Sequence, residues 1–532
     1  MSWRTTRGSS GHGLEPNHVA VIDLGSNSWR LVVYSYQAEP TGSVWWKRTD
    51  ELYEAVRIGE GLNATGALTA AAMERGLETL GAFSRFCRGS GLVPHEVHVF
   101  ATSAIRDATN RDEFLRLVRE ATGYSVEVLS TADEAHYGYV AAINSTTIRD
   151  GVVLDIGGGS MQLIQVADRL EQRSASFPLG AVRMTEAFLP DAADRGPATG
   201  KELKRLRAHV ARALSTSDWL QGHGGRLVGM GGSVRNLAAA AERVRYGDEG
   251  ATDLGVQGFL ITKAELDDLV DRLARLPARA RRSVPGIKPG RSDIILAAAV
   301  VIQAVVETGG FAGLEVTESG LREGIFLART MLDDERTVFD NVRETAVRNL
   351  AVQYESDIPH TEHVARLALE MHDSLSVQGV IDPLPGEREL LWSASMLHDV
   401  GMTISYGDHH KHSRYLILSA ELPGFDPRER ALIAQITRYH RKGVPKLGEW
   451  AKLAGPGDSQ LLARSAMILR LAEHLERCRD QSVNQVRFET DSACGCLRLM
   501  ADGDLTLPRW SVERYGDDEA FQRTFNRPLM IG

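Results

Sequence analysis

The sequence predicts an α/β protein that is built from two related halves and continues into a mainly helical region. Residues 18–36 (HVAVIDLGSNSWRLVVYSY) and 151–166 (GVVLDIGGGSMQLIQV) both alternate short β-branched runs around a glycine-containing tip that follows an aspartate. Such runs are typical of paired hairpin strands, and their recurrence indicates an internal duplication. Beyond about residue 338 the strand patterns give way to amphipathic helical patterns.

The composition is that of an ordinary globular protein, with 43% hydrophobic and 25% charged residues among 532. This length predicts three or four domains. The formal net charge of −9 argues against a protein that coats nucleic acid, but it leaves a polyanionic substrate open. Without a long apolar run, we expect no membrane span, no signal peptide, a disordered tail over residues 1–17 and a cytoplasmic location. The four cysteines are few and predict no disulfide framework.

The glycine-rich tips carry the first chemical signal. Glycines 157–159 lack a Cβ atom, so their backbone N–H groups can approach an anion closely. Asp155 at the end of the preceding strand is well placed to hold a divalent cation against phosphate oxygens, and Asp23 has the same place in the first hairpin. A third glycine-rich turn spans residues 229–233. Each could be merely a tight turn, but together they predict a phosphate-binding cleft.

Eight motifs, in order from residue 19 to about 480, resemble those of the exopolyphosphatase / guanosine pentaphosphate phosphohydrolase (Ppx/GppA) family. They are DLGSNSWRL, ATSAIRDATN, STADEAHYGYVAA, DIGGGSMQL, FPLGAVRMTE, GMGGSVRNLA, GLREGIF and MLHDVGMTISYGDHHKHSRYLI. The resemblance implies an α/β fold of two actin-like (ASKHA), ribonuclease-H-like lobes, an all-α HD-like domain and a small C-terminal α+β module. The expected bounds are 18–140 with 309–330 for the first lobe, 141–308 for the second, 338–480 for the HD-like domain and 481–532 for the module.

The same resemblance implies a phosphoric anhydride hydrolase that releases terminal orthophosphate from inorganic polyphosphate with the help of Mg²⁺. Guanosine pentaphosphate is the alternative substrate. A non-catalytic sensor that binds polyphosphate or a guanosine alarmone is the alternative from a different class. A sugar or acetate kinase on the same fold is least favoured, because the motifs are those of the phosphatases. We expect a homodimer, with neither nucleic acid nor membrane as a partner.

The resemblance also assigns roles to individual residues. Glu134 is expected to orient the attacking water, Arg106 to bind the substrate phosphate, and Asp155 with Asp23 to position Mg²⁺. Without the resemblance, Thr131 and Glu134 would simply form a helix capping box, and Arg106 would be a surface arginine. The groups expected to bind phosphate lie in the three glycine-rich turns: Ser26, Asn27, Gly157, Gly158, Ser160, Gly231, Gly232 and Ser233.

Two segments leave alternatives open. The central loop reads GGGSMQL where the family usually reads GGGSTEL, so Met161 and Gln162 replace a hydroxyl and a carboxylate. This departure predicts an altered metal affinity or substrate preference. Residues 273–293 form an arginine-rich run among prolines and glycines. The run is either a solvated face or a basic wall of the cleft for a long polyphosphate chain. GLREGIF (residues 320–326) is expected to be structural, near the hinge between the lobes.

Histidines gather in the helical region, which holds nine of the sixteen in about a quarter of the chain. Their order, with an adjacent His-Asp pair, resembles the HD phosphohydrolase superfamily, except that a glutamate stands where the last ligand of that superfamily is aspartate. Imidazoles and carboxylates from several helices can enclose one or two divalent metals. His363 could replace the first ligand, but only His360 has the expected spacing to Val364. The domain either binds a second divalent metal or is an inherited scaffold. The expected ligands are His360, His398, Asp399, His412, His440 and Glu473.

Overall fold

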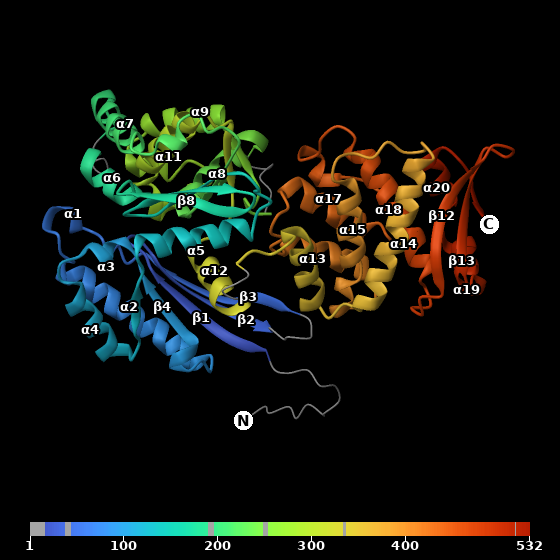
Figure 1. Ribbon diagram of the computed structural model, residues 1–532, viewed down its shortest axis with the longest axis horizontal. Coiled ribbons are helices and arrows are strands. Elements are labelled where there is room, and N and C mark those ends of the chain that lie inside the picture. The colour runs from blue at the N-terminus through green and yellow to red at the C-terminus, as the bar shows by residue number, and fades with distance from the viewer. Residues whose placement is uncertain (1–15, 38–43, 190–195, 248–253, 333–336, 517) are drawn as a thin grey trace.

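The computed structural model describes the chain in six segments: residues 16–37, 44–189, 196–247, 254–332, 337–516 and 518–532. The sequence predicts a disordered tail over residues 1–17, and residues 1–15 of it lie outside the described residues. Two α/β lobes lie one above the other, and a helical domain beside them ends in a small sheet (Figure 1). Within the six segments, no helix is both long and apolar enough to cross a lipid bilayer.

The first lobe is built on a five-stranded sheet of order β3-β2-β1-β4-β5. The hairpin β1–β2 is antiparallel, whereas β4 runs parallel to β1 and β5 parallel to β4. Helices α2 and α4 pack on one face, where Phe83 and Phe114 are buried beneath Trp29 and Leu31 of the sheet. The elements are β1 (Asn17–Leu24), β2 (Trp29–Gln37), β3 (Trp45–Glu54), α1 (Leu62–Thr65), α2 (Ala70–Gly89), β4 (Val97–Ala101), α3 (Ser103–Asp107), α4 (Arg111–Thr122) and β5 (Val126–Val128).

The second lobe repeats this arrangement in a six-stranded sheet of order β10-β11-β9-β6-β7-β8. An antiparallel hairpin, β6–β7, is again followed by parallel strands, β9 and β11. Apart from β10, the two sheets thus share one order of strands, as expected from the internal duplication that the two hairpin sequences predict. The elements are β6 (Gly151–Ile156), β7 (Met161–Ala167), β8 (Leu170–Phe177), α6 (Ala181–Phe188), α7 (Gly200–Leu214), β9 (Arg226–Met230), α8 (Gly232–Tyr246), β10 (Leu260–Thr262), α9 (Lys263–Ala274), α10 (Ala278–Arg281), α11 (Ile295–Gly309) and β11 (Gly313–Val316).

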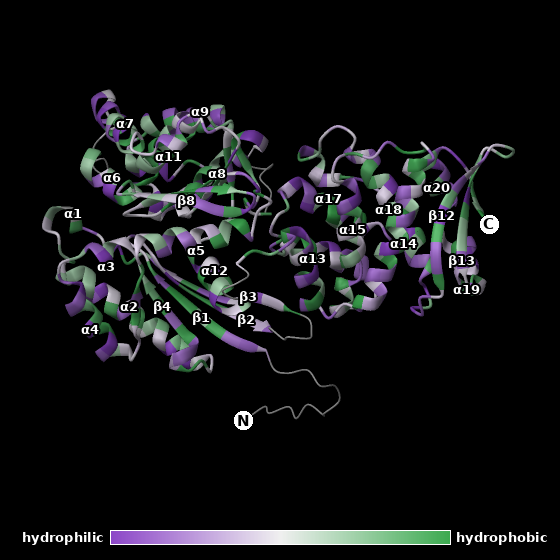
Figure 2. Cartoon of the chain, viewed as in Figure 1, coloured by the Kyte–Doolittle hydropathy of each residue, from purple (hydrophilic) through white to green (hydrophobic). Residues whose placement is uncertain are grey.

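Two helices join the lobes. α5 (Thr131–Ile143) and α12 (Leu321–Phe326) lie between the two sheets (Figure 1). A single buried cluster contains Tyr139 of α5 and Phe326 of α12, together with residues of both sheets. The segment 309–330, expected in the first lobe, is therefore divided: β11 pairs with β9 and β10 in the second sheet, whereas α12 packs between the sheets. In Figure 2, hydrophobic residues colour much of β1, and hydrophilic residues are prominent on the peripheral helix α7.

The region after residue 341 is a bundle of helices followed by a three-stranded sheet of order β12-β13-β14. Residues 481–532, for which the sequence predicts a small α+β module, contain this sheet with two helices, and Phe488 and Phe521 share one buried cluster with Leu471 and other residues of the bundle. The elements are α13 (Val342–Gln353), α14 (Ile358–Val377), α15 (Glu387–Leu397), α16 (His409–Ser419), α17 (Pro427–Arg438), α18 (Asp458–Leu475), β12 (Val483–Asp491), β13 (Cys496–Gly503), α19 (Thr506–Tyr515), α20 (Asp518–Phe525) and β14 (Leu529–Ile531).

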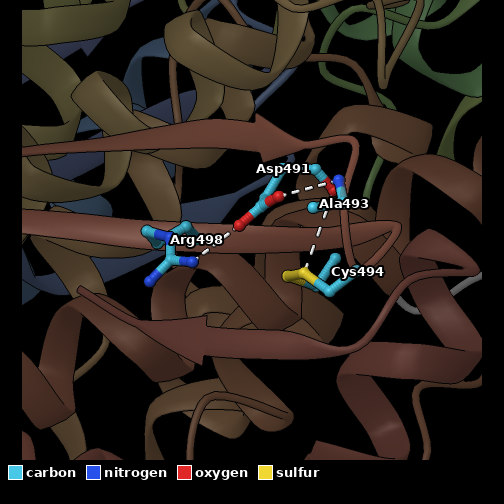
Figure 3. The surroundings of a disulfide bond; sticks show 5 residues. Asp491, Ala493, Cys494 and Arg498 are labelled. Carbon is cyan, nitrogen blue, oxygen red and sulfur yellow. Dashed lines mark hydrogen bonds and ion pairs between the residues drawn. A yellow bond between two sulfur atoms is a disulfide. The ribbon is translucent and has the colours of Figure 1, made fainter.

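A disulfide bond joins Cys494 and Cys496 at the turn between β12 and β13. This bond differs from the prediction of no disulfide framework, which rests on how few cysteines the chain has. Around it, Asp491 Oδ1 accepts a hydrogen bond from the backbone N–H of Ala493 at 2.9 Å, and Asp491 Oδ2 pairs with Arg498 at 2.6 Å (Figure 3). These contacts hold the hairpin turn at the end of the molecule opposite the two lobes (Figure 1).

Candidate active site and helical-domain cluster

The tips of the two duplicated hairpins meet at a cleft between the lobes. The loops that follow β1 and β6 line a cavity of about 130 Å³, and the turn between β9 and α8 closes a third side. The lining consists mostly of polar residues and glycines, so the cleft suits an anion better than an apolar ligand. Its residues are Asp23, Gly25, Ser26, Asn27, Ser28, Arg30, Thr102, Ser103, Glu134, Asp155, Ile156, Gly157, Gly158, Ser160, Gln162, Gly231, Gly232, Arg235, Arg291, Gly320, Leu321 and Arg322.

Two glycines allow the loops to approach each other closely. At Gly159 a Cβ atom would lie 2.5 Å from Ser103 Oγ, and at Gly231, where φ is +102°, it would lie 2.6 Å from the carbonyl oxygen of Ile156. Both distances are too short for a side chain, so glycine is required at these positions. The hydroxyl groups of Ser26 and Ser103, 3.0 Å apart, link the first loop to α3. Backbone amides are thereby brought to the edge of the cleft, where they can bind an anion.

Helix α5 presents Glu134 to the cleft from its first turn. The capping box that the sequence suggests, Thr131 with Glu134, is not the one that forms. Instead, Ser130 Oγ accepts a hydrogen bond from the backbone N–H of Asp133 at 3.1 Å, and Asp133 Oδ2 accepts one from the N–H of Ser130 at 3.0 Å. Because Asp133 satisfies the free amide at the helix end, the carboxylate of Glu134 is left to face the cleft.

Three donors surround the Glu134 carboxylate, which is 5% exposed. Arg106 Nη1 donates to Oε1, Gln162 Nε2 donates to Oε2 at 2.9 Å, and Ser160 Oγ lies 3.3 Å from Oε2. Burial raises the pKa of Glu134 to about 7; the neighbouring Arg106 opposes this effect, and Asp155 and Asp23 reinforce it. A carboxylate with a pKa near 7 is matched to accept a proton at neutral pH.

Two further carboxylates line the same cavity. Burial and the charge of Asp23 raise the pKa of Asp155 to about 6. Asp23 Oδ1 is buried without a hydrogen-bond partner, and Asp23 Oδ2 lies 3.5 Å from Arg322 Nη1. Repelling carboxylates with a free buried oxygen favour a divalent cation, because the cation satisfies the oxygen and removes the repulsion. Oxygen donors of this kind fit Mg²⁺, which is commonly held by one or two carboxylates and by substrate phosphates.

Four arginines, at positions 30, 235, 291 and 322, enter the cleft from different elements. Burial lowers the pKa of Arg235 to about 10, and the charges of Arg30, Arg322 and Arg291 contribute to this shift. Guanidinium groups that repel each other in a partly buried site favour a bound anion of high charge. The cleft therefore combines an acidic pair suited to a cation with basic groups suited to an anion.

A second cluster of ionisable side chains lies inside the helical domain. Glu473 Oε2 of α18 lies 3.2 Å from His360 Nε2 and 3.3 Å from His398 Nε2. His409 Nε2 lies 3.2 Å from Asp399 Oδ1. The expected ligand His412 does not take part: α16 begins at His409, and it is the imidazole of this first residue that reaches Asp399, whereas His412 lies on a partly exposed face of the helix.

The imidazoles of this cluster are held in one tautomer by the backbone. The Nδ1 atoms of His398, His409 and His440 lie 2.6, 3.0 and 2.7 Å from the carbonyl oxygens of Ser395, Tyr406 and Thr437. A carbonyl can only accept a hydrogen bond, so each Nδ1 carries a proton and Nε2 is the ring atom left to bind a metal. Burial lowers the pKa of His409 and that of His440, the latter to about 3, whereas Asp399 and Glu473 outweigh burial at His398 and raise its pKa to about 9. The Nε2 atoms of His409 and His440 then face each other at 3.1 Å. Converging lone pairs of this kind are the arrangement of a metal site.

A polar pocket of about 250 Å³ opens onto this cluster beside Asp399. Arg479 lines the pocket, and its Nη2 atom pairs with Asp399 Oδ2 at 2.5 Å, while Nη1 lies 3.3 Å from Asp357 Oδ2. His363, the alternative first ligand, faces elsewhere: its Nε2 atom lies 2.9 Å from the carbonyl oxygen of Val483. The cluster thus has an opening to solvent through which an ion could enter.

The sequence matches the pattern of the Ppx/GppA phosphatase family over residues 49–332, and that of domain III of the Ppx/GppA phosphatases over residues 342–504. The chain belongs to the Ppx/GppA phosphatase family. It is thereby a hydrolase of phosphoric anhydrides. The match to domain III includes the whole of β12 and β13, in agreement with the core that this sheet shares with the helices.

Two solved structures with TM-scores above 0.5 support the two-lobed fold, and a third is similar to this chain in sequence. An exopolyphosphatase from Cytophaga hutchinsonii is 22% identical with a TM-score of 0.52, and the match covers 61% of this chain and 100% of that one. An exopolyphosphatase-like protein is 26% identical with a TM-score of 0.51, covering 59% and 98%. A Ppx/GppA family member from Aquifex aeolicus is 27% identical with a TM-score of 0.49, covering 59% and 98%.

Most residues that the family motifs single out line the cleft. Arg106 contacts Glu134 but is not itself among the lining residues, and Ser233 is fully buried, with an Oγ atom that has no hydrogen-bond partner. The sequence predicts a structural role for GLREGIF, yet Arg322 of this motif lines the cavity and pairs with Asp23. Sequence reasoning also missed several lining residues that carry no local anion-binding signal: Arg30, Thr102, Ser103 and Arg235.

The arginine-rich run at residues 273–293 does not form a continuous wall. Within this run only Arg291 lines the cavity. Arg281 is fully buried and donates through Nε to the carbonyl oxygen of Leu273 at 3.0 Å. The remaining basic residues of the run are exposed: Arg275, Arg279, Arg282 and Lys288. The solvated-face interpretation therefore describes most of the run.

Proposed function

We propose that this Ppx/GppA phosphatase is an exopolyphosphatase, which releases the terminal orthophosphate of inorganic polyphosphate by water attack. The observation that carries the proposal is Glu134, a buried carboxylate with a pKa of about 7 in a cleft ringed by four arginines and glycine-rich turns. Among the described residues that line this cleft, none is aromatic. The lining thus offers groups for phosphate and no stacking platform for a guanine base.

In the proposed reaction, backbone N–H groups of the two hairpin tips hold the oxygens of the terminal phosphoryl group. The groups proposed are those of Ser26, Asn27, Gly158 and Ser160, whereas the N–H of Gly157, which the family motif also suggests, donates to the carbonyl oxygen of Ser160 at 3.0 Å. Glu134 Oε atoms orient a water molecule and take its proton as the water oxygen bonds to phosphorus. The bridging P–O bond breaks, and the shortened polyphosphate keeps the bridging oxygen. Arg106, through its bond to Glu134, holds the base in place; its contact with substrate phosphate stays a prediction from the family motif.

Asp155 and Asp23 would hold Mg²⁺ in this site, where the ion neutralises charge on the phosphate oxygens. The four cleft arginines bind the phosphates of the departing chain, since each additional phosphate adds negative charge where guanidinium groups repel each other. A substrate with several consecutive phosphates therefore fits this site better than a monophosphate does.

The test is phosphate release by the purified full chain with Mg²⁺, with long-chain polyphosphate and guanosine pentaphosphate supplied in parallel. Wild type is compared with Glu134→Ala and with Glu120→Ala, a control carboxylate whose side chain is 59% exposed on α4. Release from polyphosphate that only Glu134→Ala abolishes supports the proposal. Release from the nucleotide alone transfers the function to alarmone turnover. Binding of either compound without any release leaves a sensor protein.

We also propose that the helical-domain cluster binds one or two divalent metal ions. The observation in favour is the convergence of the Nε2 atoms of His398, His409 and His440, in rings that backbone carbonyls fix through Nδ1. A mixed imidazole and carboxylate donor set suits zinc, iron, manganese or nickel better than Mg²⁺. His360, Asp399 and Glu473 supply the remaining donors of the set.

Elemental analysis of the purified protein tests this second proposal. Wild type is compared with His409→Ala and with His412→Ala, a matched control three residues along the same helix. Stoichiometric metal in wild type and in the control, with loss in His409→Ala, supports the site. Equal metal content in all three proteins contradicts it, and so does the absence of metal after incubation with zinc or manganese followed by gel filtration.

A further inference from the structure

Gln162 is a direct neighbour of Glu134. Apart from Arg106, no group with a role predicted from the family motifs lies as close to Glu134. Gln162 is a residue of β7, is 2% exposed, and stands directly across the hairpin from Asp155. Its Nε2 atom donates to Glu134 Oε2 at 2.9 Å and lies 3.1 Å from Ser160 Oγ. The carboxamide therefore bridges the central glycine-rich loop and the carboxylate of α5.

The orientation of this carboxamide follows from its partners. A carboxylate offers only acceptors, so the NH₂ group of Gln162 has to face Glu134. The other carboxylate oxygen of Glu134 is held by Arg106. Donors on both oxygens fix the plane of the carboxylate, and the lone pairs that are left point along defined directions. Without the amide, Oε2 would keep only the longer contact to Ser160, at 3.3 Å.

The chemical type of residue 162 matters as much as its position. A carboxylate here would stand within hydrogen-bonding distance of Glu134, and two carboxylates at such a distance share one proton instead of both ionising. The neutral amide donates a hydrogen bond without adding charge. It thus leaves Glu134 as the single carboxylate at the place where the attacking water would lie, while Asp155 and Asp23 remain the carboxylates available to a cation.

We propose that Gln162 is a positioning residue, which holds the carboxylate of Glu134 in the orientation required to accept a proton from the attacking water. This inference rests on the proposed hydrolase function and deepens it. It assigns a role to the carboxamide that replaces the carboxylate usual in the family. The charged groups that face Glu134 from the surrounding elements are Arg106 of α3, Asp155 of β6 and Asp23 of β1.

The kinetic test compares Gln162→Leu and Gln162→Glu with wild type. Gln165→Leu serves as the control, because it makes the same substitution in the same strand three residues away, where the side chain contacts His223. In Gln162→Leu we expect kcat to fall about 10- to 100-fold, the usual effect of losing a hydrogen bond to a charged group, with KM for polyphosphate and the Mg²⁺ requirement within twofold of wild type. A metal-ligand role would instead change the Mg²⁺ requirement.

The pH profile gives the readout that a structural role would not move. An amide that donates to the ionised form stabilises it, so its removal raises the pH at which Glu134 loses its proton. The acid limb of kcat/KM is therefore expected to move to higher pH in Gln162→Leu, and by about one unit or more in Gln162→Glu. The profile of Gln165→Leu should superimpose on that of wild type. An unchanged acid limb and kcat in both Gln162 variants would overturn the proposal.

Infrared difference titration separates this inference from the proposed function, because it needs no substrate. The carboxyl signal of Glu134 is isolated by subtracting the spectrum of Glu134→Gln, in wild type and in Gln162→Leu. A midpoint that rises on removal of the amide establishes the contact even if the wild type releases no phosphate, in which case only the proposed function fails. A midpoint that stays the same while the wild type is active removes Gln162 from the mechanism and leaves the hydrolase intact.

Discussion

The interlobe cleft and the helical-domain cluster both gather buried carboxylates, but each surrounds them with different chemistry. In the cleft, Asp155 and Asp23 stand among glycine amides and four arginines, so groups suited to a cation and groups suited to an anion lie side by side. In the helical cluster, Asp399 and Glu473 stand among imidazoles whose tautomers are set by backbone carbonyls. Under the two proposals, the cleft would bind its cation together with a phosphate substrate, and the helical cluster would supply a metal with most of its ligands itself.

The strongest way to separate the two sites is to remove one cleft carboxylate. Asp155→Asn is expected to lower phosphate release about 1,000-fold, because the charge stabilisation that a catalytic cation supplies amounts to several kcal/mol. The metal content of the helical cluster should stay that of wild type. Asp150→Asn, at an exposed carboxylate just before β6, is the matched control. Phosphate release that survives in Asp155→Asn would shift the chemistry from the cleft to the helical domain.

The converse experiment removes one imidazole from the helical cluster. His409→Ala should weaken metal binding by about 100-fold or more, since even residues that only orient a metal ligand contribute 10- to 100-fold. Calorimetric titration with zinc or manganese measures the loss, and His412→Ala should bind as wild type does. Metal at 100 times its dissociation constant stabilises a fold by about 2.7 kcal/mol, so the same metal should raise the Tm of the control but not of His409→Ala. Equal affinities in both variants would exclude His409 as a ligand.

The burial of Glu134 predicts a stability effect with a definite sign. Its pKa is raised from 4.5 to about 7 in the fold, so the folded state binds the proton more tightly than the unfolded chain does. Glu134 therefore favours folding at low pH, and this contribution is lost as pH rises from about 4.5 to 7, by an amount on the order of 3 kcal/mol. Glu134→Gln should accordingly raise the Tm relative to wild type at pH 8 and have little effect at pH 4.5.

Thermal unfolding at the two pH values measures this difference. Glu120→Gln, at an exposed carboxylate of α4, should show no pH-dependent gain. Glu134→Gln should also lose phosphate release, because the amide cannot accept the proton from water. A Tm difference that is the same at both pH values would mean that Glu134 is not held in a raised-pKa environment, and would weaken its assignment as the base.

Sequence reasoning reached those parts of the cleft that are local in the chain. The strand, aspartate and glycine loop at residues 151–160 are contiguous, so their chemistry is visible in a single motif. Arg30, Arg235 and Arg322 come from a strand and two helices, and only the folded lobes bring them into one cavity. No periodicity marks such residues, because each looks like an ordinary surface arginine on its own element.

The register of the helices was the second limit on predicting site residues from the sequence. The run HHKH at residues 409–412 offers three histidines within four residues, and the start of α16 decides which of them faces Asp399. The structure begins the helix at His409, directly after Asp408, whose φ is +57°. The segment STADE likewise contains two overlapping capping boxes, and the loop after β5 selects Ser130 with Asp133. One residue of register thus separates a capping carboxylate from one that faces the cleft.

The smallest expected effect follows from this register and concerns the two adjacent carboxylates of α5, Asp133 and Glu134. Asp133→Ala removes the capping box and should lower the free energy of unfolding by about 1 kcal/mol, because the backbone N–H of Ser130 loses its acceptor. The value of kcat should remain within a few-fold of wild type, since Asp133 makes its contacts at the helix end and does not line the cleft. Denaturant unfolding and phosphate release on the same preparation measure both quantities. Asp112→Ala, at a first-turn residue of α4 whose side chain is 88% exposed, is the control. If Asp133→Ala lost activity to the extent expected for Glu134→Ala, the catalytic register of α5 would have to be moved by one residue.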